Sequence, residues 1–227
     1  MQPKSCNLDV MTGLRRYDDP CGIARALDVV GDRWALLVVR ELIFGPKRFV
    51  QLRAGLRGIS PNVLSQRLRD LEHAGIVRRD VLDEPASVAI YELTARGQAL
   101  EPILLELGRW GSEQPVAATT ELSVNSLLIA LKTVFDPAAG ADATYALTID
   151  GHRFGVTIAG ASIDITPGRP PQAEVTLATD VATLRSVAFG RMAMGRAERD
   201  GRLTVGGDRR LAEQFTRMFP VRRQPPL

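Results

Sequence analysis

The stretch ISPNVLSQRLRDLEHAGIVRR, from residue 59 to residue 79, constrains the fold of this chain more than any other. It predicts a helix that begins after Ser60, where a hydroxyl-bearing cap precedes a proline, and that ends at Gly75. At about 100° per residue, one side of this helix is apolar and carries Leu64, Leu68 and Leu71. Burial of that side does not account for the polar row opposite, which consists of Asn62, Ser65, Gln66 and Arg69.

The segments around this helix give the first 112 residues a definite order. Apolar spacing and turn residues predict helices over 21–31, 32–45 and 49–58, strands over 76–82 and 88–93, and a last helix from Thr94 through Trp110. Asp32 is the expected N-cap of the second helix. Four helices, a hairpin and a closing helix match the layout of a winged helix-turn-helix domain, which we place at residues 1–112.

In such a domain the polar row of the two-faced helix lies in the major groove of double-stranded DNA. Asparagine and glutamine amides match the edge of adenine, and an arginine guanidinium matches the edge of guanine. We therefore predict that four side chains read bases, namely Asn62, Ser65, Gln66 and Arg69.

The distribution of charge agrees with a polyanionic partner. The net charge of the whole chain is only +3, yet ten basic residues stand against three acidic ones between Arg33 and Arg79. An excess of this size suits DNA, although a basic run is also ordinary for a solvated face. The predicted phosphate contacts are Lys47, Arg48, Arg53, Arg57, Arg67, Arg78 and Arg79.

A second domain follows a short polar segment. SEQPVAATT predicts a linker, placed at 113–120, and the second domain spans 121–227. Its pattern predicts a helix over 122–135, four short strands between 143 and 179, two helices, a strand over 203–207 and a closing helix over 208–219. This order indicates an α+β layer with antiparallel pairing.

Several classes of function are not supported by the sequence. Two histidines and two cysteines, far apart in the chain, predict no metal site. We find no catalytic set and no cofactor-binding motif, so we expect neither an enzyme nor a cofactor. The absence of a long apolar stretch and of an apolar signal region predicts a cytoplasmic protein without a membrane partner.

Residues 21–111 resemble the HxlR family of bacterial winged-helix regulators. The resemblance rests on CGIARALDVVGDRWALLVVRELIFGPKRF, ISPNVLSQRLRDLEHAGIV and YELTARG, which occur in that order. It implies a homodimeric transcriptional regulator that binds a palindromic operator and pairs through the first and last helices of the domain. The hairpin turn departs from the family, since it carries Asp83 and Glu84 where relatives are often basic.

Cys21 has two interpretations. From the residues alone it is a small buried hydrophobe. The resemblance instead maps Cys21 onto a position where some family members carry a redox-sensing thiol. A regulator that responds to oxidation through Cys21 is therefore kept as an alternative.

The second domain resembles the sterol-carrier-protein-like fold, through AEVTLATDVATLRSVAFGRMAMGRAERDGRLTVGGDRRLAEQF. The chain is thus expected to be a mainly α winged helix-turn-helix domain followed by an α+β sterol-carrier-like domain. The resemblance implies an apolar cavity for a small hydrophobic effector. Its candidate lining is Leu184, Val187, Ala188, Phe189, Met192, Met194, Phe215, Met218 and Phe219. The same residues also suit an ordinary core, and a lipid-binding module whose ligand is not coupled to DNA is a further alternative.

Overall fold

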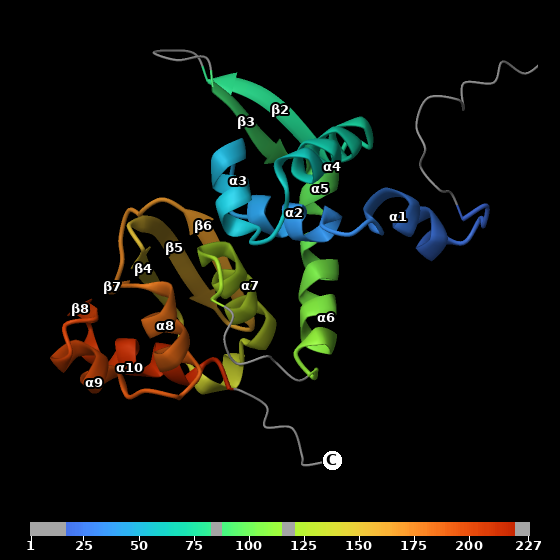
Figure 1. The fold of residues 1–227 in the computed structure, drawn as a ribbon. Helices are drawn as coiled ribbons and strands as arrows, with labels where there is room; N and C mark the ends of the chain where they lie inside the picture. Colours follow the sequence, from blue (N-terminus) through green and yellow to red (C-terminus); the bar gives the residue numbers. More distant parts are fainter. Residues whose placement is uncertain (1–16, 83–87, 115–120, 221–227) are drawn as a thin grey trace, which may run out of the picture.

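The structure, a computed structural model, describes residues 17–82, 88–114 and 121–220 (Figure 1). Most of the predicted linker and the hairpin-turn residues Asp83 and Glu84 lie outside the described residues. Cys6 also lies outside them.

The N-terminal domain has the predicted winged helix-turn-helix layout. Its elements are α1 (Gly22–Val30), α2 (Ala35–Leu42), β1 (Lys47–Arg48), α3 (Phe49–Gly55), α4 (Pro61–His73), β2 (Val77–Leu82), β3 (Val88–Leu93), α5 (Ala95–Gln98) and α6 (Glu101–Gly111). The strands form one antiparallel sheet in the order β1-β3-β2. Its core lies where α2 packs against α3, α4 and the hairpin, and Val38, Leu42 and Leu64 are fully buried there.

Two local predictions for this domain are wrong, each for a physical reason. Asp32 does not cap the second helix, which begins at Ala35 after Trp34, because the Asp32 carboxylate pairs with Arg67 instead. The single helix expected after Thr94 is two helices. Pro102 lies in the first turn of α6 and lacks an N–H for the carbonyl of Gln98, where α5 ends.

The C-terminal domain is an α+β layer. Its elements are α7 (Val124–Val134), the 3-10 turn η1 (Pro137–Ala139), β4 (Ala143–Ile149), β5 (His152–Ala159), β6 (Ser162–Pro167), β7 (Val175–Thr179), α8 (Val181–Ala188), α9 (Met194–Arg199), β8 (Leu203–Gly207) and α10 (Arg209–Arg217). The sheet order is β6-β5-β4-β7-β8. It is a mixed sheet, so the expectation of antiparallel pairing throughout is corrected: β4 and β7 pair in parallel.

Helices cover one face of this sheet. Tyr145 points to the helical side, where its ring lies 4.8 Å from that of Phe215 on α10, and α7 contacts β6. Residues that alternate with Tyr145 along β4, such as Ala146 and Thr148, point to the other face.

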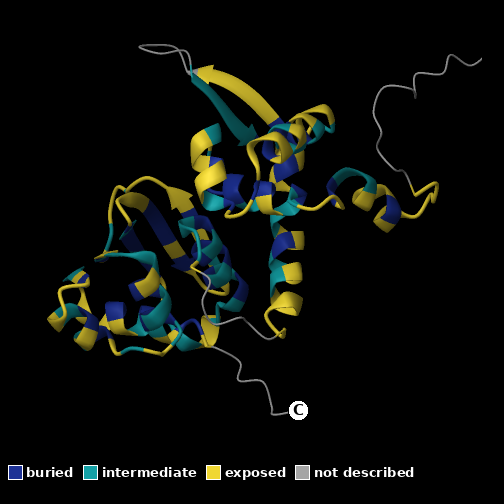
Figure 2. Cartoon of the chain, viewed as in Figure 1, coloured by how far each residue is buried: buried dark blue, intermediate teal, exposed yellow. Residues whose placement is uncertain are grey.

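The two domains share a continuous apolar core. The ring of Phe44, just beyond α2, meets the ring of Phe154 on β5 edge-on at 6.3 Å. Helix α7 packs against both α2 and α6 of the first domain. The side of α6 that faces α7 is therefore closed, and its other side is not (Figure 2).

Candidate nucleic-acid interface

Helix α4, which we call the recognition helix, presents the predicted polar row. Its N-terminus is fixed by Ser60, whose Oγ accepts from the N–H of Val63 at 3.3 Å. Three members of the row are exposed and Ser65 is half-buried. Gln66 Nε2 donates to Asp70 at 2.8 Å, and the Arg69 guanidinium donates to Gln66 Oε1 at 2.6 Å. These bonds hold the amide and the guanidinium in place on the surface before any partner binds.

Five of the seven predicted phosphate contacts are exposed, namely Arg48, Arg53, Arg57, Arg78 and Arg79. Arg78 forms an ion pair with Glu92 across the hairpin at 2.7 Å. Arg53 and Arg79 have no ion-pair or hydrogen-bond partner within the described parts of the chain. A solvated guanidinium without a partner is available to a phosphate oxygen.

Three predicted phosphate contacts form ion pairs with residues outside the hairpin, namely Arg67, Arg57 and Lys47. Arg67, whose side chain is only 15% exposed, pairs with Asp32 and with Asp70, and so ties the recognition helix to the segment before α2. Arg57 pairs with Glu121, just before α7.

Lys47 is the third, and its ammonium lies 2.8 Å from Glu41 in the interior. Its location differs from the one expected from the run of basic residues, because a buried carboxylate draws the ammonium inward.

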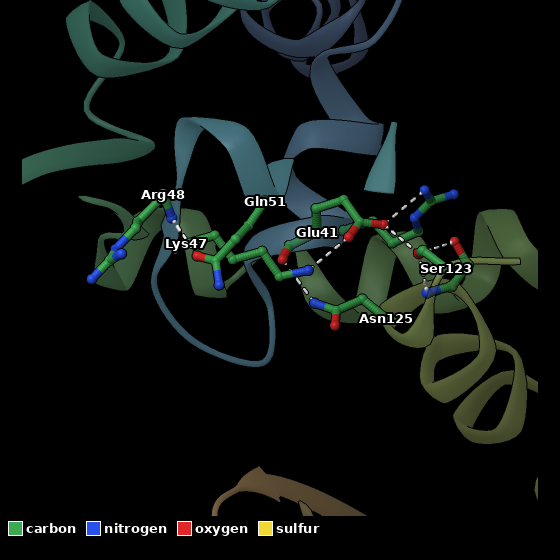
Figure 3. A network of polar contacts seen from close by, with 8 residues as sticks. Glu41, Lys47, Arg48, Gln51, Ser123 and Asn125 are labelled. Carbon is green, nitrogen blue, oxygen red and sulfur yellow. Dashed lines mark hydrogen bonds and ion pairs between the residues drawn. The ribbon is translucent and has the colours of Figure 1, made fainter. Parts of the chain in front are cut away.

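Glu41 is the centre of the contact between the domains (Figure 3). Its side chain is 0% exposed, yet its carboxylate accepts hydrogen bonds from Arg40 at 3.0 Å, Lys47 at 2.8 Å and Ser123 at 2.6 Å. Ser123 is also the N-cap of α7, and the amide of Asn125 donates to the backbone oxygen of Glu41 at 2.7 Å. One side chain of α2 thus holds the first turn of the second domain's first helix.

Burial alone raises the pKa of the Glu41 carboxyl, but Lys47, Ser123 and Arg40 stabilise the ionised form more strongly and hold the pKa below its usual range. Sequence reasoning missed this residue. The available signal was an acid inside a helix that is apolar on nearly every side.

Two helices of the first domain expose apolar side chains. On α6, Ile103, Leu107 and Trp110 follow one another at helical spacing, and Trp110 is 65% exposed. On α1, Ile23 is 72% exposed, and Leu27 is exposed one turn later. Rows of this kind are uncommon on surfaces that contact only water.

The nine residues expected to line an apolar cavity are gathered in one place, beneath the helices of the second domain. Seven of them are buried, and the rings of Phe215 and Phe219 pack edge-on at 5.0 Å. Phe189 and Met192 are partly buried against the same core. Neither of the two pockets described contains any of the nine, so a ligand-lining role for them stays a prediction.

The larger of the two pockets, of about 290 Å³, lies on the opposite face of the sheet and contains Arg153 and Arg169. The other, of about 260 Å³, lies beside α1 and contains Arg25 and Arg96.

Cys21 precedes α1 and is exposed, so its interpretation as a buried hydrophobe is wrong. Its redox role stays a prediction. Among the described residues no group of histidine, cysteine, aspartate and glutamate side chains is arranged to hold a metal ion. None of the described helices has the length and apolar character needed to cross a membrane.

Comparisons with known proteins match each domain to a family. The HxlR-like helix-turn-helix model matches residues 29–118, and the SCP-2 sterol transfer family matches residues 130–220. The chain is 43% identical over 89 residues to the uncharacterized HTH-type transcriptional regulator YvaP of Bacillus subtilis, covering 39% of this chain and 82% of the relative. It is 38% identical over 88 residues to the HTH-type transcriptional regulator YodB of Bacillus subtilis, covering 39% of this chain and 79% of that protein.

Among solved structures, the reduced form of YodB from Bacillus subtilis is 36% identical and covers 41% of this chain and 92% of that one, with a TM-score of 0.38.

Proposed function

Because the chain belongs to the HxlR family of helix-turn-helix transcriptional regulators and carries an SCP-2-type domain, we propose that it binds a palindromic operator as a homodimer under the control of a small hydrophobic effector. The observation that carries the proposal is the exposed, mutually hydrogen-bonded pair Gln66 and Arg69 in the polar row of the recognition helix. That row lies in a segment with a local excess of basic residues. We propose that the row reads bases and that the exposed arginines around it contact phosphates.

Dimerisation is supported by the exposed apolar rows of α1 and α6. We propose that a two-fold dimer covers these rows and presents its two recognition helices to successive major grooves, about 34 Å apart, as an inverted repeat requires. Helix α6 then has two neighbours: the partner subunit on its apolar row, and α7 of its own chain on the other side, where Lys132 pairs with Glu101. In this arrangement a movement of α7 in the second domain would shift α6 and so change the spacing of the two recognition helices.

The test is DNA binding measured by fluorescence anisotropy, with DNA from upstream of the protein's own gene and random duplex as probes, at several salt concentrations. We expect the affinity for the upstream DNA to exceed that for random duplex by about 10³-fold or more. Equal, weak binding to both probes contradicts the proposal for that promoter. A scan of genomic fragments then tests whether any operator exists, and the absence of selective binding to every fragment contradicts the proposal altogether. An effector that alters operator affinity must itself bind with altered affinity when the operator is present. A ligand affinity unaffected by DNA instead supports the uncoupled ligand-binding module.

The first prediction concerns base reading. Gln66→Ala removes an amide that donates to Asp70 and accepts from Arg69, so operator affinity falls by about 1–3 kcal/mol and preference relaxes at one base pair. The measurement is anisotropy on the operator and on operators with single base changes. A loss of the same size on random duplex contradicts base reading.

The second prediction concerns phosphates. Arg53→Ala and Arg79→Ala each weaken operator and random duplex alike, and each reduces the slope of log affinity against log salt by about one unit. Arg217→Gln is the control, because this exposed arginine lies on α10 in the other domain and its loss leaves the slope unchanged. An unchanged slope in Arg53→Ala or Arg79→Ala removes that residue from the phosphate contacts.

A further inference from the structure

The connection from β6 to β7, residues 168–174, crosses the face of the large sheet that the helices leave uncovered. It has to pass β5 and β4 to reach β7. Gly155 lies beneath it, where a Cβ atom would sit 3.3 Å from the ring of Pro170. Gly155 pairs with Ala146, which alternates with the helix-facing Tyr145. The connection is fastened at both ends, by the bond from Gly168 to the Arg153 carbonyl and by the bond from Glu174 to the Thr144 carbonyl.

A groove of about 290 Å³ runs beside this connection. Small side chains form its floor, among them Ala146, Thr148, Thr176 and Thr204. Two cations stand at its edge, Arg153 on β5 and Arg169 on the connection itself. None of its lining residues is acidic.

The charged and hydroxyl groups of this groove have no partners within the described residues. Neither guanidinium forms an ion pair or a hydrogen bond with any residue that the structure describes, and the same holds for the hydroxyls of the three lining threonines. Two solvated guanidinium groups beside three free hydroxyls attract a carboxylate or a phosphate. The methyl groups of the floor suit a short apolar body, and the volume limits the ligand to a small molecule.

We propose that this groove binds a small amphipathic anion, with a carboxylate or phosphate head group between Arg153 and Arg169 and a short apolar body along the threonine and alanine floor. The proposed site is on the face of the sheet opposite the buried apolar cluster.

The groove and the contact between the domains lie on opposite faces of the same strand, β5. Along β5, Arg153 lines the groove, and the next residue, Phe154, turns to the other face, where it packs on Phe44 of the DNA-binding domain. Pro167, the last residue of β6 before the connection, lies beside Gly45, where a Cβ atom would be 3.6 Å from the proline ring. An anion that orders β5 and the connection therefore acts on the DNA-binding domain through these two contacts. This consequence rests on the proposed function, whereas the binding of the anion does not.

The test is isothermal titration of the full chain with octanoate, octyl phosphate and the neutral octanol. We expect both anions to bind and octanol to bind at least about tenfold more weakly, because it cannot form charge-assisted bonds. The tighter of the two anions identifies the head group. Equal affinity for octanol and for the anions overturns the proposal, as does the absence of anion binding.

Two variants and a control locate the site. Arg153→Ala/Arg169→Ala weakens anion binding about tenfold or more, and Ala178→Phe fills the floor from an exposed position on β7 and also weakens it. Arg196→Ala/Arg217→Ala removes two exposed arginines outside the groove and leaves the affinity unchanged. Unchanged anion affinity in both groove variants overturns the site.

Operator affinity measured with and without octanoate separates the two proposals. A change that is lost in Arg153→Ala/Arg169→Ala supports regulation through the groove. Intact anion binding with unchanged operator affinity keeps the site and contradicts the effector role for this class of ligand.

Discussion

Replacing Glu41 with glutamine lowers the free energy of unfolding by roughly 3–5 kcal/mol, the range for breaking a buried, hydrogen-bonded ion pair. The carboxylate is fully buried and accepts hydrogen bonds from Arg40, Lys47 and Ser123. A glutamine amide has a single acceptor oxygen, and its NH₂ group faces donors that it cannot satisfy. Because Ser123 caps α7, the variant also loosens the contact between the two domains. Urea unfolding measures the loss, and amide hydrogen exchange in α7 reports where it occurs.

The effect of Glu41 depends on pH in a defined direction. Its pKa in the folded chain lies below the ordinary value of 4.5. Its stabilising contribution is therefore complete above that ordinary value and is lost as the pH falls through the lowered pKa. Glu41→Gln has no such group, so the difference in stability between wild type and variant shrinks on acidification and is constant near neutral pH.

A surface ion pair provides the matched control. Glu213→Gln makes the same chemical change in a pair with Arg209 that is about half exposed on both sides, and it costs less than about 1 kcal/mol. If Glu41→Gln costs no more than this control, the carboxylate does not anchor the domains. A loss that does not depend on pH below 4.5 leads to the same conclusion.

Local signals made the recognition helix and the hairpin predictable. Ser60 and Pro61 define a helix start in adjacent residues, and three leucines define its buried side within two turns. The polar row follows directly from that periodicity, and the structure exposes three of its four members, with Ser65 half-buried.

The features that the sequence did not reveal depend on residues far apart in the chain. Lys47 looks like a phosphate contact until Glu41 is known to be buried, and Glu41 in turn bonds Ser123, 82 residues away. Asp32 has a side chain that commonly caps helices, but its carboxylate forms an ion pair with Arg67, 35 residues later. The parallel pairing of β4 with β7 likewise requires a connection that crosses the sheet. The sequence pattern predicts each strand by itself and does not indicate which strands pair. The groove beside that connection could not be predicted either, because its lining residues come from separate strands and from the connection.

We expect replacement of Leu107 with glutamate to convert the proposed dimer to a monomer and to lower operator affinity by about 10²-fold or more. Leu107 is the middle member of the exposed apolar row on α6 and lies between Ile103 and Trp110. A carboxylate there has no partner when a second copy covers the row, so the dimer carries the cost of a buried, unpaired charge. The loss in operator affinity follows because two linked recognition helices bind with a high effective concentration that a monomer lacks.

Light scattering coupled to size exclusion measures the change in mass, and anisotropy on the operator measures the change in affinity. Arg217→Gln alters the net charge by the same amount on α10, away from the row, and stays dimeric with unchanged operator affinity. Two outcomes contradict the pairing through α6: a dimeric Leu107→Glu, or a monomeric variant that binds the operator as tightly as the wild type. In the second case a single recognition helix with its surrounding arginines suffices for binding, and the operator is read as one half-site.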